Sequence, residues 1–189
     1  MKNRNGFYPK GRFEVYCWNL FGNSELIEIV RPLNINQCLN LLGKEKWSLL
    51  SNNITVDEGL NNILDVYFKS GSASANWYIG LKGTNETPIA GWDAAGIGED
   101  FTESEIYSEL VRQTWTTAAV SSKSITNSAS PATFNMNDSG TIYGAFLVSD
   151  NTKGGTSGKM WCCSDFPVAR PVVNGDTLKI VYTIQSQDV

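Results

Sequence analysis

Short stretches of alternating apolar and polar residues recur along this chain, and they restrict its fold more than any other feature. In Gly11–Asn19, the residues Phe13, Val15 and Cys17 fall on one side of the alternation. Glu25–Val30 alternates again after a Leu-Phe-Gly-Asn turn. A period of two residues is typical of a strand with one buried face. The two stretches therefore predict a hairpin, which the following Arg-Pro pair ends because proline cannot donate to the ladder.

Later stretches of the same kind predict most of the remaining fold. Ser, Thr, Asn and Gly crowd the connections between them, and Asp-Ser-Gly and Asn-Gly-Asp turn signals precede two of them. Short strands separated by regular turns are typical of an antiparallel sandwich. We therefore predict a mainly β fold, an antiparallel β-sandwich or jelly-roll-like body. The further strands are expected at residues 77–81, 114–125, 132–136, 141–148, 159–163 and 177–184.

One amphipathic helix is predicted at about residues 56–70. Thr55 and Glu58 fit the T-x-x-E capping box, and Gly71 stands where a C-terminal glycine belongs. Spacings of three and four predict one apolar stripe, which we expect to cover the protein's own sheet rather than form a partner groove. The stripe consists of Leu60, Ile63, Leu64, Tyr67 and Phe68.

The chain has 189 residues and a mass of 20.8 kDa, which allows one compact domain or one domain with an appendage. We expect residues 1–10 to form an N-terminal arm and residues 11–189 a single β-rich domain. Residues 88–110 read as a long loop with several acids. Within residues 33–50 we expect a short helix and then an irregular or strand segment.

Composition excludes several kinds of chemistry. The chain has no histidine, so Ser-His-Asp and Cys-His catalysis within one chain are excluded. A net charge of −4 and a pI near 4.9 argue against sequence-independent binding of nucleic acid. The N-terminus has no apolar stretch after its charges, and no run approaches membrane-spanning length. We therefore expect a soluble protein made in a reducing cytoplasm, with no membrane partner.

Four cysteines are present, at positions 17, 38, 162 and 163, and their spacing suits no metal cluster. Two interpretations stay open, of which reduced, buried thiols are favoured. The alternative is a disulfide from Cys17 to Cys162 or Cys163.

Three local motifs favour structural interpretations. Gly154–Lys159 has three residues between its glycines instead of four, so it does not match a phosphate-binding loop. The acidic run 99–109 lacks the calcium-loop pattern and is expected to be a solvated loop. A carboxylate pair of the glycosidase type is not specified by any spacing among the 19 acids. We predict no catalytic, cofactor-binding or metal-binding residues.

Six tryptophans raise the question of a sugar-binding platform, which would use exposed rings. Exposed aromatic residues at an assembly interface are the favoured alternative, because such residues are enriched there. The residues expected at a protein interface are Arg4, Phe7, Tyr8, Trp47 and Trp92.

Six segments resemble, in this order, a family of small virion structural proteins of tailed bacteriophages. The resemblance covers nearly the whole chain, although the acidic loop near Glu99 and residues 33–50 depart from the family pattern, the latter as an insertion. The segments are Gly6–Tyr16, Glu58–Asp65, Trp77–Gly83, Asn127–Ala132, Gly144–Gly155 and Gly175–Leu178.

The resemblance implies a non-enzymatic component of the virion. We expect a capsid decoration or cement protein that stabilises the head lattice through repeated surface contacts. Its partners would be the major capsid protein or other virion proteins, with self-association in the particle. The alternatives are a tail, neck or fibre component and, less favoured, a glycan-binding module or a virion-associated hydrolase.

Overall fold

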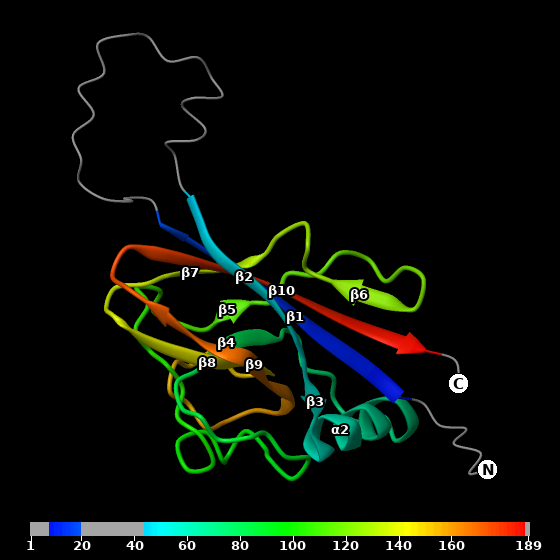
Figure 1. Cartoon of the computed structure of the whole chain (residues 1–189). Coiled ribbons are helices and arrows are strands. Elements are labelled where there is room, and N and C mark those ends of the chain that lie inside the picture. Colours follow the sequence, from blue (N-terminus) through cyan, green and yellow to red (C-terminus); the bar gives the residue numbers. More distant parts are fainter. Residues whose placement is uncertain (1–7, 20–43, 188–189) are drawn as a thin grey trace, which may run out of the picture.

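The protein folds into a mainly β body that carries one helix (Figure 1). The structure is a computed structural model, and it describes residues 8–19 and 44–187. Between the named strands of this part, every pairing is antiparallel. The elements are β1 (Tyr8–Asn19), β2 (Lys44–Asn52), β3 (Ile54–Thr55), α2 (Asp57–Phe68), β4 (Tyr78–Lys82), β5 (Gln113–Thr114), β6 (Ser124–Thr126), β7 (Ala132–Asn135), β8 (Gly140–Val148), β9 (Met160–Val172) and β10 (Asp176–Gln187).

Two five-stranded sheets form the body. The first has the order β2-β1-β10-β6, and β7 also pairs with β10. The second has the order β3-β9-β8-β4-β5. The prediction of a mainly β, sandwich-like fold is therefore confirmed.

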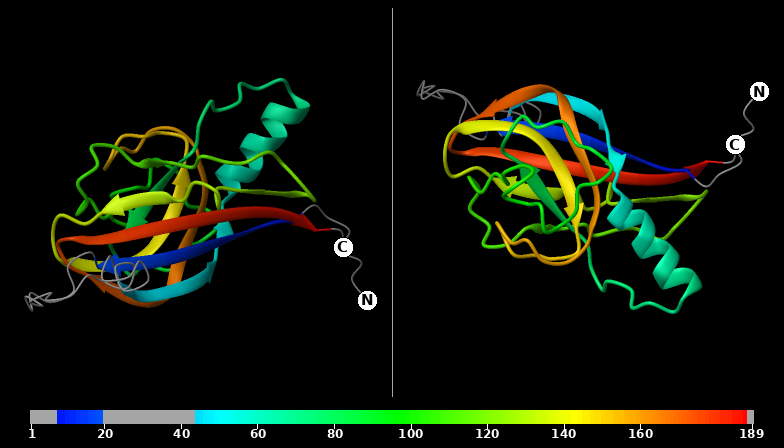
Figure 2. Two further views of the ribbon diagram at one scale, coloured as in Figure 1. Left: turned by 90° about the horizontal axis from the view of Figure 1, so that it is seen from above. Right: turned by 90° about the horizontal axis from the view of Figure 1, so that it is seen from below.

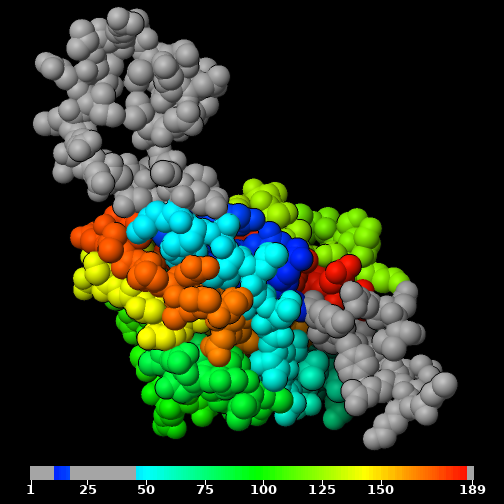
Figure 3. All heavy atoms as spheres, viewed as in Figure 1, coloured from blue at the N-terminus to red at the C-terminus, as the bar shows by residue number. Residues whose placement is uncertain are grey.

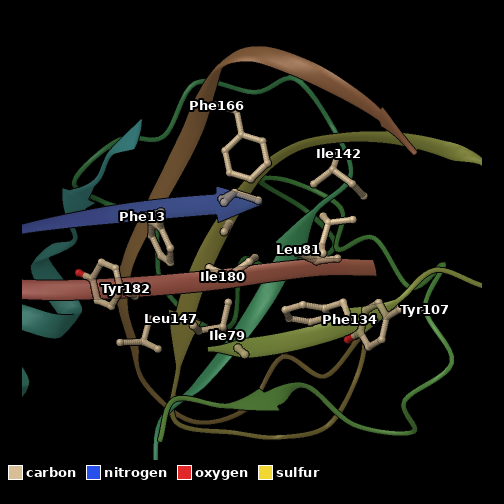
Figure 4. Close-up of a cluster of buried hydrophobic side chains, with 14 of the residues drawn as sticks. Phe13, Ile79, Leu81, Tyr107, Phe134, Ile142, Leu147, Phe166, Ile180 and Tyr182 are labelled. Atoms are coloured by element: carbon tan, nitrogen blue, oxygen red, sulfur yellow. The ribbon is translucent and has the colours of Figure 1, made fainter. Parts of the chain in front are cut away.

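The main core lies between the two sheets (Figure 4). Phe13, Val15 and Cys17 of β1 are fully buried, as their alternation predicted. Phe13 stacks on Tyr182 of β10 with 4.3 Å between ring centroids. From the second sheet, β4 contributes Ile79. Because side chains from both sheets pack into this one core, strands that are far apart in the chain form a single body.

The two sheets join where β2 continues into β3. Only Asn53 separates these strands, yet β2 pairs with β1 and β3 pairs with β9. At this corner the hydroxyl oxygens of Ser51 and Ser164 lie 2.6 Å apart, and Ser164 donates to the carbonyl of Asn52. Figure 3 shows β2, in cyan, against the orange atoms of β9.

Several predicted boundaries differ from the structure. β1 begins at Tyr8, inside the predicted arm, and its described partners are β10 and β2. Residues 44–50 belong to β2, so the strand alternative for the end of the 33–50 segment is confirmed. The single strand predicted at 114–125 is replaced by β5 and β6, because residues 115–123 join neither sheet. The predicted strand 25–30 and the short helix before residue 43 lie outside the described residues.

The helix α2 lies where the sequence predicted it, but its ends differ. Val56 is the N-cap residue and makes no side-chain capping bond, so the predicted Thr55–Glu58 capping box is wrong. At the other end the left-handed residue is Ser70, with φ of 61°, rather than Gly71. Figure 2 shows α2 and the beginning of β1 at the same end of the sandwich.

Candidate interaction site at one end of the sandwich

The outward face of α2 carries large apolar side chains with nothing described over them. Leu64, Tyr67 and Phe68 are 54%, 80% and 73% exposed. We call these three residues the outer stripe. The prediction that the helical stripe covers the protein's own sheet is therefore wrong for these residues, although Ile63 does pack against the core. Adjacent exposed apolar groups of this size are typical of an interaction surface.

The position of α2 follows from Gly59, the buried residue of the helix. A Cβ atom at Gly59 would lie 2.7 Å from the carbonyl oxygen of Trp161. The helix therefore approaches the backbone of β9 through its smallest residue. The outer-stripe residues, five to nine positions further on, are turned away from the sheet.

Glu58 fixes the first turn of α2 to two neighbouring segments. Its carboxylate accepts hydrogen bonds from the backbone N–H of Met160 at 2.7 Å and of Ala94 at 3.0 Å. Lys159 donates to the other oxygen at 3.1 Å. The side chain that was expected to cap the helix instead holds the helix against β9 and the 88–110 loop.

A pocket of about 640 Å³ opens beside α2, between the two sheets. We call it the tryptophan pocket. Trp115 and Trp161 are nearly buried in its wall, and their indole N–H groups donate to the carbonyl and hydroxyl oxygens of Tyr182. The lining consists of Asn62, Ile63, Ala75, Asn76, Trp77, Thr114, Trp115, Thr116, Thr117, Ile125, Leu147, Trp161 and Ile184.

The chemistry of the tryptophan pocket suits an uncharged, apolar guest. None of the described residues that line it is an acid or a base. Since the Trp115 and Trp161 N–H groups already have partners, their rings offer mainly apolar surface. Pockets of this volume are large enough to enclose an aromatic or branched side chain.

A second, acidic hollow of about 460 Å³ lies along the other flank of α2. Asp57, Asp65 and Asp93 line it, together with Glu58 and Lys159, which are paired with each other. The first turn of α2 is acidic, and its last turn carries no base. This flank of the helix is therefore negative, which favours a partner segment with positive charge.

The 88–110 loop holds a buried ion pair that sequence reasoning missed. Arg112 is fully buried, and its guanidinium contacts the carboxylate of Glu103 through three hydrogen bonds of 2.8–3.1 Å. Arg112 also donates to the carbonyl oxygens of Asp150 and Gly155. Glu103 is therefore no part of a solvated acidic run, and the pair fixes residues 150–155 of the Gly144–Gly155 segment.

Lys82, the last residue of β4, forms another ion pair; its own side chain is fully buried and that of its partner Asp165 is partly exposed. Its ammonium group contacts Asp165 and the carbonyl oxygen of Glu86. The ammonium nitrogen also lies 5.6 Å from the ring centroid of Trp92. Both ion pairs serve the fold, because every group in them is committed to a partner inside the protein.

Trp92 is not an exposed interface residue, and that prediction is wrong. It is 5% exposed, stacks on Phe101 at 5.0 Å and belongs to a second buried cluster. Trp47 is half-buried against the main core, with the guanidinium of Arg170 5.3 Å from its ring. Arg4 and Phe7 lie outside the described residues. Only the backbone of Tyr8 is described, where it pairs with Gln187.

Cys17, Cys162 and Cys163 are free and buried, as the favoured interpretation expected. Loss of hydration disfavours the thiolate in each case. It raises the pKa of Cys163 from 9.0 to about 12, and the pKa of Cys162 is also raised. These thiols pack as small apolar groups. Cys38 lies outside the described residues.

Among residues 8–19 and 44–187, no group of three or more Cys, Asp or Glu side chains is placed to hold a metal ion. In the same ranges, no helix is long and apolar enough to cross a membrane.

Comparison with known proteins adds no relative. No protein-family model matches the chain, and no curated protein is significantly similar to it.

The tryptophan pocket could not be located from sequence, because its lining comes from parts of the chain more than 120 residues apart. Asn62 lies on α2, Trp77 precedes β4, and Ile184 lies on β10. The only sequence pattern that indicated an interaction site in this region was the apolar stripe of the helix, and the exposed residues of that stripe are the outer stripe.

Proposed function

We propose that the chain is a non-enzymatic structural protein of a tailed-phage virion that decorates the capsid and stabilises the head lattice. Two lines of support lead there. The order of six sequence segments resembles that of small phage virion proteins. The fold carries an exposed apolar surface at one end of a rigid sandwich.

The observation that carries this proposal is the outer stripe. Leu64, Tyr67 and Phe68 project from a helix that Glu58 and Gly59 hold in a fixed position. A preorganised apolar surface loses little conformational entropy on binding. Symmetry in a particle repeats a modest contact many times, so weak single contacts become a stable association.

Other classes of function find less support in this geometry. A sugar platform needs exposed indole faces, yet Trp92, Trp115 and Trp161 are buried, while Trp47 and Trp77 are half-buried. The buried carboxylate of Glu103 is engaged by Arg112 rather than facing an open cleft. The second candidate is a tail, neck or fibre component, which would use the same surface at a position of lower copy number.

The proposal is tested by adding the purified protein to particles assembled without it and measuring the bound fraction by sedimentation. We expect Leu64→Ser/Tyr67→Ser/Phe68→Ser to lose binding. A matched control removes three exposed apolar residues elsewhere and should bind normally. It carries Leu110→Ser, Val120→Ser and Val168→Ser.

Equal binding by both triple variants would show that the outer stripe is not the contact. Absence of binding by the unmodified protein, at any concentration tested, would contradict the decoration role itself.

A further inference from the structure

The tryptophan pocket has an apolar interior and an acidic neighbour, and residues of α2 line both. Figure 2 shows that α2 lies at the end of the sandwich where β1 begins. The described lining of the pocket is uncharged, whereas Asp57, Asp65 and Asp93 lie across α2 from it. A matching guest would carry one large apolar side chain and, a few residues away, positive charge.

The segment that precedes β1 has this composition. Residues 1–7 read Met-Lys-Asn-Arg-Asn-Gly-Phe, with Lys2, Arg4 and Phe7 and no acid. The five residue steps from Lys2 to Phe7 span at most about 18 Å when extended. Asn62 lines both the tryptophan pocket and the acidic hollow, so the two sites adjoin, and a segment with Phe7 in the pocket directs Lys2 and Arg4 toward the acidic flank of α2.

The direction of β1 indicates that the pocket belongs to a different copy of the chain. Tyr8 pairs with Gln187, three positions beyond the pocket residue Ile184, and β1 then runs past Ile184, which pairs with Gly11. Three strand positions correspond to about 10 Å, so Tyr8 lies that far along the sheet from the part of its own pocket that Ile184 lines. Residues 1–7 would have to reach back over this distance to enter the pocket of their own subunit, whereas binding to a neighbouring copy carries no such requirement.

We infer that residues 1–7 of one copy dock on the α2 end of a second copy, with Phe7 in the tryptophan pocket and Lys2 and Arg4 against the acidic flank. The contact joins the arm of one copy to the pocket of the next, so it is heterologous. Repeated contacts of this kind form either an open chain of subunits or a closed symmetric ring. The inference rests on the proposed function in treating the α2 end as a protein-binding face. It leaves the outer stripe free for the capsid.

The test uses two full-length variants with complementary defects. The arm variant carries Lys2→Glu, Arg4→Glu and Phe7→Ala. The pocket variant carries Ala75→Trp, which places an indole at an exposed position of the pocket lining. Ala73→Trp is the matched control, since Ala73 is also exposed, lies two residues away and does not line the pocket. Lys179→Glu controls for the change of charge at an exposed site.

Analytical ultracentrifugation reads the outcome. The unmodified protein and both controls should associate as concentration rises, while each defective variant alone should stay monomeric. A mixture of the two variants should form a one-to-one dimer and nothing larger, because it offers only one intact arm and one intact pocket per pair. Losing Phe7 alone should weaken association about 30-fold or more, as for a central anchor residue.

Three results would overturn the inference. The first two are an unmodified protein that stays monomeric and an arm variant that associates normally. The third is a mixture of the two variants in which no heterodimer forms, although the circular dichroism spectrum of each variant is that of the folded protein. These measurements use purified protein alone. Their failure is therefore distinct from failure of the proposed virion role, which is measured on particles.

Discussion

Replacing Glu103 by glutamine should destabilise the fold by several kcal/mol, although the side chain keeps its shape. The Arg112 side chain is 0% exposed and that of Glu103 is 1% exposed, so the variant removes the buried counter-charge that touches the guanidinium and leaves only the partly exposed Asp150 carboxylate, 3.8 Å away. Breaking one side of a buried pair costs about 3–5 kcal/mol. Since domains of this size are stable by only about 5–15 kcal/mol, the variant should be close to unfolding.

Urea denaturation followed by tryptophan fluorescence measures this loss as a shift of the midpoint at constant slope. The matched control is Glu14→Gln, which removes a carboxylate from the exposed pair that Arg12 and Glu14 form at 2.7 Å. That change should cost less than about 1 kcal/mol, because water screens exposed pairs.

Hydrogen exchange gives a local readout of the same pair. The backbone N–H of Gly154 donates to Glu103 at 2.8 Å, and in the variant this amide should lose protection before the core does. A Glu103→Gln protein as stable as the Glu14→Gln control would refute the structural role assigned to the pair.

Two further predictions concern the packing of α2 and the buried thiols. Gly59→Ala should destabilise the protein by about 1–3 kcal/mol, because the added Cβ atom would meet the backbone of Trp161. The control Gly91→Ala adds its Cβ atom to open space and should leave stability nearly unchanged. Urea denaturation measures both variants. The pKa of Cys163 is raised to about 12 in the fold, so this thiol ionises first in the unfolded chain, near 9.0. Its contribution to stability should therefore be constant below that pH and fall as pH rises toward 12. Cys163→Ala should make this alkaline slope shallower by about 1.4 kcal/mol per pH unit, and an unchanged slope would contradict the assignment.

The sequence predicted what depends on local pattern. The alternation of Phe13, Val15 and Cys17 identified a strand with one buried face, and the spacing of apolar residues located α2 within two residues of its ends. These features depend on neighbours in the chain. The periods of a strand and a helix can therefore reveal them.

The errors concern contacts between distant segments. A helical stripe says which side of a helix is apolar, but not which residue approaches the sheet, and here it is Gly59 rather than a large side chain. Trp92 lies in a loop, and its burial depends on Phe101 and Lys82. Glu103 reads as one acid in a run, and only the fold places Arg112 against it. Such pairings have no period along the chain.

The role in the virion is the central claim, and the copy number of the chain in purified particles tests it most directly. Quantitative mass spectrometry would compare it with the major capsid protein. A decoration protein should be present at a copy number comparable with that of the capsid protein. A ratio far below this would place the chain in the tail, neck or fibres and contradict decoration. Complete absence from the particles would contradict a structural role in the virion.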